Sequence, residues 1–245
     1  MNNNSVSPRE WVLKLVREYF GSSEPSLVDV QAIFLWGSIL RLDFDADSSD
    51  IDCVAIGGPN AEDANLLELR DNARAKHHEL AHLNLRRLYL CDLNGEEPNS
   101  ELARLIDPRL LLADFPTWLW VWGRHLSLSN FRLRPCTLQE AYSIRLLALR
   151  RRLQRCLDVR RTEPPRYVLK EAGYLIHVIH QLSRDIHPFS YTELEKRSDE
   201  MTKNLSRAIV SARAHGWPED ECEGAVPLIL NLLDQIGERT FNSLT

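Results

Sequence analysis

The N-terminal part of the chain carries the pattern of an amphipathic helix. Ser7, Pro8 and Glu10 form the start signal of a helix. A capping serine and a glutamate three residues later can accept hydrogen bonds from free amides of the first turn, and proline suits the first helical position because it has no N–H to leave unpaired. Apolar residues then recur three and four positions apart as far as Gly21, and glycine commonly ends helices. The pattern predicts a helix that begins at Pro8 and ends near Gly21.

After this helix the pattern changes to that of a sheet. Two short apolar runs, residues 32–36 and 51–56, have the length and composition of buried strands. A charged stretch at residues 62–82 predicts a helix, and residues 86–93 predict a third strand. Strands and helices in this order predict a mixed sheet with helices packed against it.

Helical patterning dominates the rest of the chain. The predicted helices there cover residues 137–157, 166–183, 191–215 and 219–241. We therefore predict an α+β fold with two domains. The first, residues 1–114, is a small domain built on the mixed sheet, and the second, residues 115–245, is all helical.

The composition is that of a globular protein with an acidic balance. Of the 245 residues 44% are hydrophobic, and the formal net charge is −5 with a pI near 5.9. This balance argues against a surface that coats nucleic acid, so a small molecule or a protein is the favoured partner, with tRNA still open. The five cysteines are scattered, and no signal peptide or membrane-spanning apolar run is evident, so we expect a cytoplasmic protein.

The strongest chemical signal lies where the two apolar runs end and begin. Gly37 and Ser38 follow the first run directly, and Asp50 and Asp52 open the second. Side chains alternate faces along a strand, so these aspartates project together and repel each other unless a cation lies between them. Glycine lets backbone approach a bulky anion, and serine offers phosphate a hydroxyl and an amide. Because Mg²⁺ is typically held by one or two carboxylates plus substrate phosphates, the set predicts metal-assisted transfer on a nucleoside triphosphate.

These residues also carry a resemblance to a known family. Gly37-Ser38, a spacer of about ten residues and the run Ser-Asp-Ile-Asp at 49–52 resemble the signature of the polymerase-β-like nucleotidyltransferase superfamily, which includes antibiotic adenylyltransferases and minimal nucleotidyltransferases. The resemblance implies ATP or another NTP as co-substrate, Mg²⁺ held by Asp50 and Asp52, and Ser49 beside the nucleotide. It also implies that the helical domain closes over the triphosphate.

The predicted helix 166–183 offers cations to the phosphates. Arg166 and Lys170 lie four positions apart and share a helix face suited to clamping phosphates, although such residues also serve as solubilising surface charges. Related adenylyltransferases follow this helix with a short loop and a Ser-Lys pair. Here Ser190 supplies the serine without the lysine, so the resemblance implies nucleotide binding at Arg166, Lys170 and Ser190.

A third carboxylate is where this sequence departs from the family pattern. The segment 88–94 resembles a stretch of minimal nucleotidyltransferases whose catalytic aspartate occupies the position of Tyr89. Asp92 is the nearest acid and our candidate for the third catalytic carboxylate, but a regular strand would point residues 89 and 92 to opposite faces. The alternatives are a bulge that re-aims Asp92, reduced or lost activity, or another acid from the spacer: Asp43, Asp45 or Asp47.

A second motif competes with this interpretation. The segment 78–82 reads His-Glu-Leu-Ala-His and matches the pattern His-Glu-x-x-His, in which two histidines one helical turn apart bind Zn²⁺ while glutamate activates water. The predicted helix ends almost at His82, and the flanking residues are charged or polar. A solvated helix end is therefore the favoured interpretation of His78 and His82, and a zinc hydrolase is the remote alternative.

Together these features predict an enzyme that transfers a nucleoside monophosphate, AMP from ATP, onto a hydroxyl of a small acceptor such as an aminoglycoside and releases pyrophosphate. Two alternatives stand beside it. One is modification of a protein or tRNA in a regulatory or toxin-like role. The other is a catalytically degenerate relative that binds nucleotide. The sequence makes no prediction of the oligomeric state.

Overall fold

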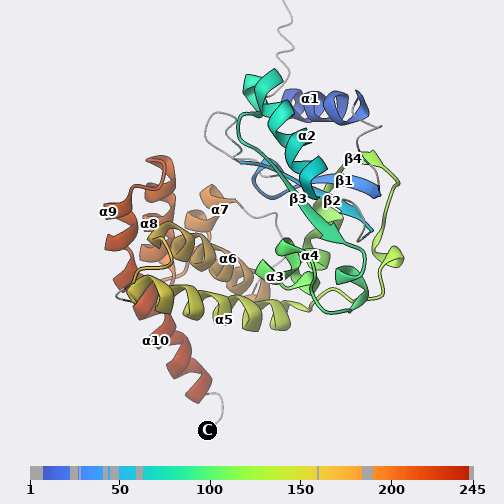
Figure 1. Cartoon of the computed structure of the whole chain (residues 1–245). Helices are drawn as coiled ribbons and strands as arrows, with labels where there is room; N and C mark the ends of the chain where they lie inside the picture. The colour runs from blue at the N-terminus through green and yellow to red at the C-terminus, as the bar shows by residue number, and fades with distance from the viewer. Residues whose placement is uncertain are drawn as a thin grey trace, which may run out of the picture. The chain divides into compact units, whose positions relative to one another are not determined.

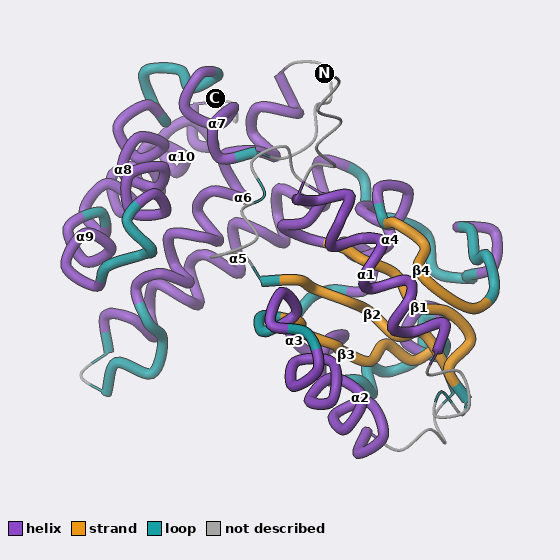
Figure 2. The backbone as a smooth tube through the Cα atoms, turned by 90° about the horizontal axis from the view of Figure 1, so that it is seen from above, coloured by secondary structure: helices purple, strands orange, loops and turns teal. Residues whose placement is uncertain are grey.

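The computed structural model describes residues 8–22, 27, 29–40, 44, 50–58, 63–158, 160–183 and 190–242. The chain divides into two compact units, Met1–Cys136 and Thr137–Thr245. The first unit contains a four-stranded sheet, and the described part of the second contains only helices and loops (Figure 2). The predicted α+β class is confirmed.

The sheet of the first unit is mixed and has the strand order β3-β2-β1-β4. Its strands are β1 Val30–Trp36, β2 Ile51–Gly57, β3 Leu83–Tyr89 and β4 Leu119–Gly123. β1 runs antiparallel to both of its neighbours, β2 and β4, whereas β3 runs parallel to β2. The two apolar runs of the sequence thus form the central strands, and their pairing brings the end of β1 beside the start of β2.

Helices cover both faces of this sheet (Figure 1). On one face lie α1 Pro8–Ser22 and α2 Asp63–Lys76, whose apolar residues meet alternate residues of the strands. On the other face lie α3 Glu101–Leu105 and α4 Pro108–Asp114. The sheet is therefore buried from both sides, which explains why its central strands are continuous apolar runs.

The face covered by α3 and α4 has an aromatic core. The ring of Phe115 lies 5.1 Å from that of Phe34 and 5.2 Å from those of Trp118 and Phe131, measured between centroids. Rings at these separations and tilts add favourable contacts to the area they bury. The same face of β2 carries Asp52, since Val54 and Ile56 belong to this core and lie two and four positions further along the strand.

The boundary between the two units lies later than the predicted one at residues 114 and 115. After α4 the chain makes a short 3₁₀ turn, Phe115–Thr117, and then adds β4 to the edge of the sheet beside β1. The run Leu-Trp-Val-Trp of β4 is apolar throughout, so its periodicity did not separate strand from helix. The sheet unit therefore extends to Cys136.

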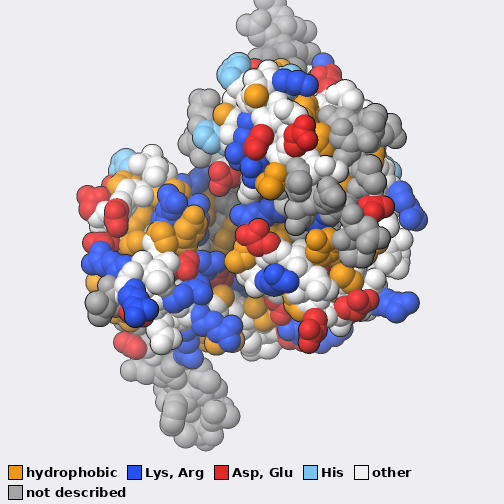
Figure 3. Space-filling model, in the orientation of Figure 1, with side chains coloured by type: hydrophobic (Ala, Val, Ile, Leu, Met, Phe, Trp, Pro, Cys, Tyr) orange, Lys and Arg blue, Asp and Glu red, His pale blue; other side chains and the backbone are white. Residues whose placement is uncertain are grey.

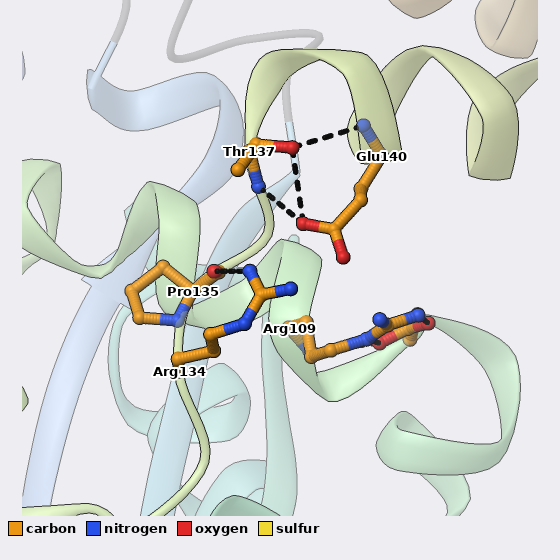
Figure 4. A network of polar contacts seen from close by, with 6 residues as sticks. Arg109, Arg134, Pro135, Thr137 and Glu140 are labelled. Atoms are coloured by element: carbon orange, nitrogen blue, oxygen red, sulfur yellow. Dashed lines mark hydrogen bonds and ion pairs between the residues drawn. The ribbon is translucent and has the colours of Figure 1, made fainter.

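The helical unit begins with a capping box. The Thr137 hydroxyl accepts the amide of Glu140 at 3.2 Å, and the Glu140 carboxylate accepts the amide of Thr137 at 2.8 Å (Figure 4). Pro135 precedes this box, and the Arg134 guanidinium donates to its carbonyl at 3.3 Å. The capping box satisfies the amides of Thr137 and Glu140, and it marks the start of the second unit.

The predicted helix 62–82 is shorter in the structure. α2 ends at Lys76, a 3₁₀ turn follows at His78–Leu80, and β3 then spans Leu83–Tyr89. The predicted strand 86–93 is thus displaced toward the N-terminus by several residues. The reason is tertiary, since β3 pairs in parallel with the whole of β2, from Ile51 opposite Leu83 to Gly57 opposite Tyr89.

Six helices make up the described part of the second unit, and they pack around one apolar core. They are α5 Leu138–Leu157, α6 Pro165–Ser183, α7 Tyr191–Lys196, α8 Lys203–Ala214, α9 Glu219–Gly224 and α10 Val226–Asn242. The predicted helix 219–241 is divided because Pro227 suits the first turn of a new helix and cannot continue the preceding one. No helix among the described residues is long and apolar enough to cross a bilayer.

The arginines of α5 have two different environments. Arg145 and Arg152 pair with the buried Glu171 of α6 at 3.2 and 3.6 Å, and Arg152 also pairs with Glu163. Arg150 and Arg151 of the same helix are exposed. Figure 3 shows basic side chains on the surface over α5. The arginine-rich sequence of this helix thus supplies both a buried ion network and a solvated face.

Candidate functional site

A tight turn after β1 brings backbone against a carboxylate. Gly37 opens the 3₁₀ turn Gly37–Leu40 with a φ of +72°, in the region that favours glycine. A Cβ atom at Gly37 would lie 3.0 Å from Oδ2 of Asp52. The glycine is therefore needed twice, for its backbone conformation and for the close approach of the Asp52 carboxylate.

The two aspartates at the start of β2 share one side of the strand. Ile51 between them is fully buried, whereas Asp50 is exposed and Asp52 is half-buried. The Ser38 hydroxyl donates a hydrogen bond to the backbone carbonyl of Asp50. The structure thus brings Gly37, Ser38, Asp50 and Asp52 together, and the serine ties the glycine turn to the strand that carries the carboxylates.

Asp52 is the middle member of a row of three residues across the sheet, which we call the Asp52 row. Trp36 at the end of β1 pairs with Asp52 in the antiparallel ladder, and Asn84 on β3 pairs with it in the parallel ladder. The Asn84 side-chain amide donates to Oδ1 of Asp52 at 3.1 Å. Both oxygens of Asp52 thus have defined neighbours, the Asn84 amide at Oδ1 and the Gly37 backbone at Oδ2.

Sequence reasoning missed both outer members of this row. Asn84 is a polar residue between Leu83 and Leu85, and strand alternation alone would place it on the face opposite to these leucines. That pattern was a usable signal, but it depended on a strand that starts at Leu83. Trp36 was assigned only to the strand, although it directly precedes Gly37.

Trp36 forms an aromatic wall beside the carboxylates. Its ring lies 5.7 Å from that of Trp118, measured between centroids. Its buried indole Nε1 has no hydrogen-bond partner within the part of the chain that the structure describes. Since tryptophan usually pairs its N–H when buried, this indole is a donor in the same row as Asp52 that a bound ligand could use.

Tyr89 and Asp92 lie at the other end of the sheet from these carboxylates. Tyr89 pairs with Gly57, which lies five positions after Asp52 on β2, a distance of about 16 Å. Asp92 lies beyond Tyr89 in a 3₁₀ turn, is almost fully buried, and accepts the amides of Tyr89 at 3.0 Å and Asn99 at 2.7 Å. Asp92 therefore caps a loop, and its placement argues against the predicted role of third catalytic carboxylate.

Comparison with known proteins establishes what kind of fold holds this site. The structure is similar to that of a spectinomycin adenyltransferase from Enterococcus faecialis that was solved with ATP and spectinomycin. The similarity has a TM-score of 0.58 at 10% sequence identity and covers 89% of this chain and 98% of the other. The chain has the fold of an antibiotic adenylyltransferase. No protein-family model matches the chain, and no curated protein matches its sequence significantly.

This similarity confirms the fold that the resemblance carried by the Gly-Ser and Asp-x-Asp residues implied. At 10% identity the evidence for it comes from the arrangement of helices and strands over nearly the whole of both chains. The chemistry of the site in this chain must therefore be argued from its own residues.

The donor set around Asp52 fits a magnesium ion that arrives with phosphate ligands. It offers two carboxylates and an approachable backbone turn, and the described residues contain no cluster of three or more acidic, histidine or cysteine ligands. Mg²⁺ is usually held by one or two carboxylates plus substrate phosphates. The neighbouring Cys53 is no ligand, because burial first and the Asp52 charge second raise the pKa of its thiol well above the usual range.

The segment 78–82 lacks the α-helical conformation that the zinc interpretation requires. His78 lies in a 3₁₀ turn, and the chain has left any helix by His82. The His78 Nδ1 atom lies 3.2 Å from the carboxylate of Glu79, its own neighbour. The motif therefore covers a solvated turn between α2 and β3.

The predicted phosphate-binding residues of the helical unit have local partners of their own. Lys170 on α6 points its ammonium over the ring of Trp217 at 5.4 Å and near that of Tyr167 at 5.9 Å, and Arg166 lies over Tyr167 at 5.0 Å. The Ser190 hydroxyl is buried and caps α7 by accepting the amide of Glu193. Both cations are thus pre-oriented by aromatic rings, while Ser190 has a structural role.

Four residues of the predicted site lie outside the described residues. They are Ser49, predicted beside the nucleotide, and the spacer acids Asp43, Asp45 and Asp47.

Proposed function

We propose that this protein is a Mg²⁺-dependent nucleotidyltransferase that moves a nucleoside monophosphate, AMP from ATP, onto a hydroxyl of a small acceptor such as an aminoglycoside and releases pyrophosphate. The observation that carries the proposal is the packing of the Gly37 turn against the Asp52 carboxylate, with Asp50 on the same side of the strand. This arrangement stands in a fold shared with an adenyltransferase that was solved with ATP.

The residues of the sheet unit have distinct parts in this reaction. Asp50 and Asp52 would hold the ion, which would neutralise phosphate charge and help to orient the acceptor oxygen. Gly37 and Ser38 offer backbone amides to the phosphates, while the Ser38 hydroxyl holds Asp50 in place through its carbonyl. Catalysis then rests on orientation and electrostatic stabilisation, with no covalent step on the protein.

The helical unit supplies positive charge in the same proposal. Arg166 and Lys170 are the proposed cations that neutralise the pyrophosphate as it leaves. Both cations rest on aromatic rings, an interaction of about 0.5–1 kcal/mol at an exposed site, so a triphosphate can recruit them at small cost. Ser49 stays in the proposal as a residue beside the nucleotide, whereas the buried Ser190 hydroxyl caps α7.

A polycationic small molecule is the favoured acceptor. The protein carries a net charge of −5, and a site with two carboxylates attracts amines. The adenyltransferase that shares the fold was solved with spectinomycin. Expression in a sensitive bacterium is therefore expected to raise resistance to one aminoglycoside or related antibiotic.

Pyrophosphate release tests the proposal directly. Purified protein with ATP and Mg²⁺ is assayed with and without a panel of aminoglycosides and lincosamides, and acceptor-dependent release is expected. Asp50→Asn and Asp52→Asn are expected to abolish release without unfolding the protein, whereas Asp220→Asn on the surface of the helical unit is the matched control. If both site variants keep more than about a tenth of the activity, the carboxylates do not hold the catalytic ion.

One observation favours a second candidate, a catalytically degenerate relative that binds nucleotide. The position opposite Asp52 on β3 is held by the uncharged Asn84, so the sheet supplies two carboxylates at this point and no third among the described residues. Binding of ATP with Mg²⁺ in the absence of any turnover across the acceptor panel would favour this candidate over the transferase.

A further inference from the structure

We propose that Asn84 is the positioning residue of the metal site: its side-chain amide holds Oδ1 of Asp52 and adds no negative charge beside Asp50 and Asp52, so that a divalent cation is taken up as its complex with the nucleotide. The inference rests on the proposed function, because it assumes that Asp52 is a metal ligand. It assigns a role to a residue that the signature motif does not contain.

Asn84 is held rigidly enough to act on its neighbour. It lies within β3, between Leu83 and Leu85, whose side chains are buried on the opposite face of the sheet. The parallel ladder places it directly opposite Asp52, and an amide-to-carbonyl bond of 3.1 Å from Ile51 to His82 extends the pairing to the start of both strands. The Asn84 amide therefore has one defined direction, toward Oδ1 at 3.1 Å.

This contact leaves the Asp52 carboxylate with a fixed orientation. Oδ1 accepts the Asn84 amide, and Oδ2 faces the Gly37 turn, where the approach of a Cβ would be as close as 3.0 Å.

The charge of the residue at position 84 decides how strongly the free ion binds. An asparagine adds no charge, so the Asp52 row and Asp50 together offer two carboxylates. An aspartate at this position would place a third carboxylate about 3 Å from Oδ1, which is unfavourable without a cation and attractive with one. With asparagine, the triphosphate must supply the missing negative ligands, as is common for Mg²⁺.

Binding of Mn²⁺ to the protein, measured by equilibrium dialysis with and without ATP as the excess of Mn²⁺ on the protein side of the membrane, tests this role without relying on activity. We expect wild-type protein to bind Mn²⁺ weakly alone and more tightly with ATP. Asn84→Asp is expected to tighten binding of the free ion at least tenfold, and Asn84→Ala to weaken the binding seen with ATP several-fold. Asn231→Asp, which adds the same charge on the surface of α10, is the matched control and is expected to bind as wild type does.

The outcomes separate this inference from the function on which it rests. If wild-type protein with ATP binds no more Mn²⁺ than Asp52→Asn does, the metal site and the proposed function both fail. If Asp52→Asn loses binding while both Asn84 variants bind like wild type, the inference about Asn84 fails and the metal site stands. Thermal unfolding of each variant shows which are folded. If Asn84→Asp does not fold without the cation, the Mn²⁺ affinity of Asn84→Ala with ATP decides whether the inference stands.

Discussion

Gly37 and Asp52 are so close that the glycine has no room for a side chain toward the carboxylate: a Cβ atom would lie 3.0 Å from Oδ2. The turn after β1 and the second residue of β2 therefore form one structural unit, although 15 positions separate them in the sequence. The φ of +72° at Gly37 adds a second requirement for glycine.

Gly37→Ala is expected to lower both stability and activity. An alanine in the left-handed region costs about 1–2 kcal/mol, and the crowded Asp52 carboxylate must move as well. Urea unfolding measures the first effect and acceptor-dependent pyrophosphate release the second. Gly21→Ala is the matched control, because no atom of another residue lies within 4 Å of the added Cβ there and alanine is the better helix former. A Gly37→Ala protein with wild-type turnover would show that the close approach is irrelevant to the chemistry.

Asp92→Asn is expected to lower the stability of the protein and to leave its metal binding nearly unchanged. The Asp92 carboxylate accepts the amides of Tyr89 and Asn99, and an asparagine would direct its own N–H₂ group toward one of these donors. Hydrogen bonds to a charged group contribute about 1.5–3 kcal/mol each, so the free energy of unfolding should fall by about 2–4 kcal/mol. Under conditions in which the variant is folded, its affinity for Mn²⁺ in the presence of ATP should equal that of the wild-type protein.

Loss of that affinity in folded Asp92→Asn protein would restore Asp92 as a ligand. The matched comparison is Asp52→Asn, which is expected to show the opposite pattern, with stability retained and metal affinity lost. The pair thus separates an acid that caps a loop from an acid that holds an ion.

Glu171→Gln is expected to destabilise the helical unit by about 3 kcal/mol. The Glu171 side chain is 7% exposed and lies 3.2 Å from Arg145 and 3.6 Å from Arg152. Removing one partner of a buried ion pair typically costs about 3–5 kcal/mol, and the lower value applies here because Arg152 keeps its contact with Glu163. Glu200→Gln is the matched control: its side chain is 94% exposed and its contact with Lys203 should contribute less than about 1 kcal/mol.

Equal stability of these two variants in urea unfolding would show that the buried network contributes no more than a surface ion pair does. The comparison is made at one pH and ionic strength, because salt weakens the surface pair more than the buried one.

The sequence predicted those parts of the site that depend on neighbours along the chain. Gly37-Ser38 after an apolar run and the alternation of Asp50 and Asp52 are local patterns, and the structure brings these residues together. Asn84 could not be found in the same way, because its importance comes from its register opposite Asp52 on a strand 32 positions away. Register between strands that are far apart is set by the whole sheet and leaves little mark on any one segment.

The errors in the fold have a similar physical origin. β4 is an apolar run that becomes a strand because the edge of β1 is open to it, so the sheet unit extends past the predicted boundary at residue 114. Asp92 lies within the predicted strand 86–93, yet it caps a turn because the strand ends at Tyr89. In both cases the intrinsic conformational propensities of the residues did not separate strand from helix or turn. The pairing of strands in the sheet decided between them.

Stability is expected to fall as the pH rises above about 8.5, and Cys53 should be a main cause. Burial first and the Asp52 charge second raise the pKa of this thiol in the folded protein. A group whose folded pKa is raised contributes stability that is complete below its unfolded pKa and is lost as the pH rises toward the folded value. Each such thiol can therefore cost up to about 1.4 kcal/mol per pH unit in this range. Urea unfolding between about pH 7 and 10 should show the decline, and Cys53→Ala should reduce its slope.

Chemical modification gives a second test of this thiol. Because Cys53 is buried and Cys91 is half-exposed, Cys53 should be alkylated far more slowly than Cys91 in folded protein and at a similar rate in urea. A slope that is the same in wild type and Cys53→Ala, together with rapid alkylation of Cys53 in the folded state, would show that the thiol beside Asp52 is open to solvent.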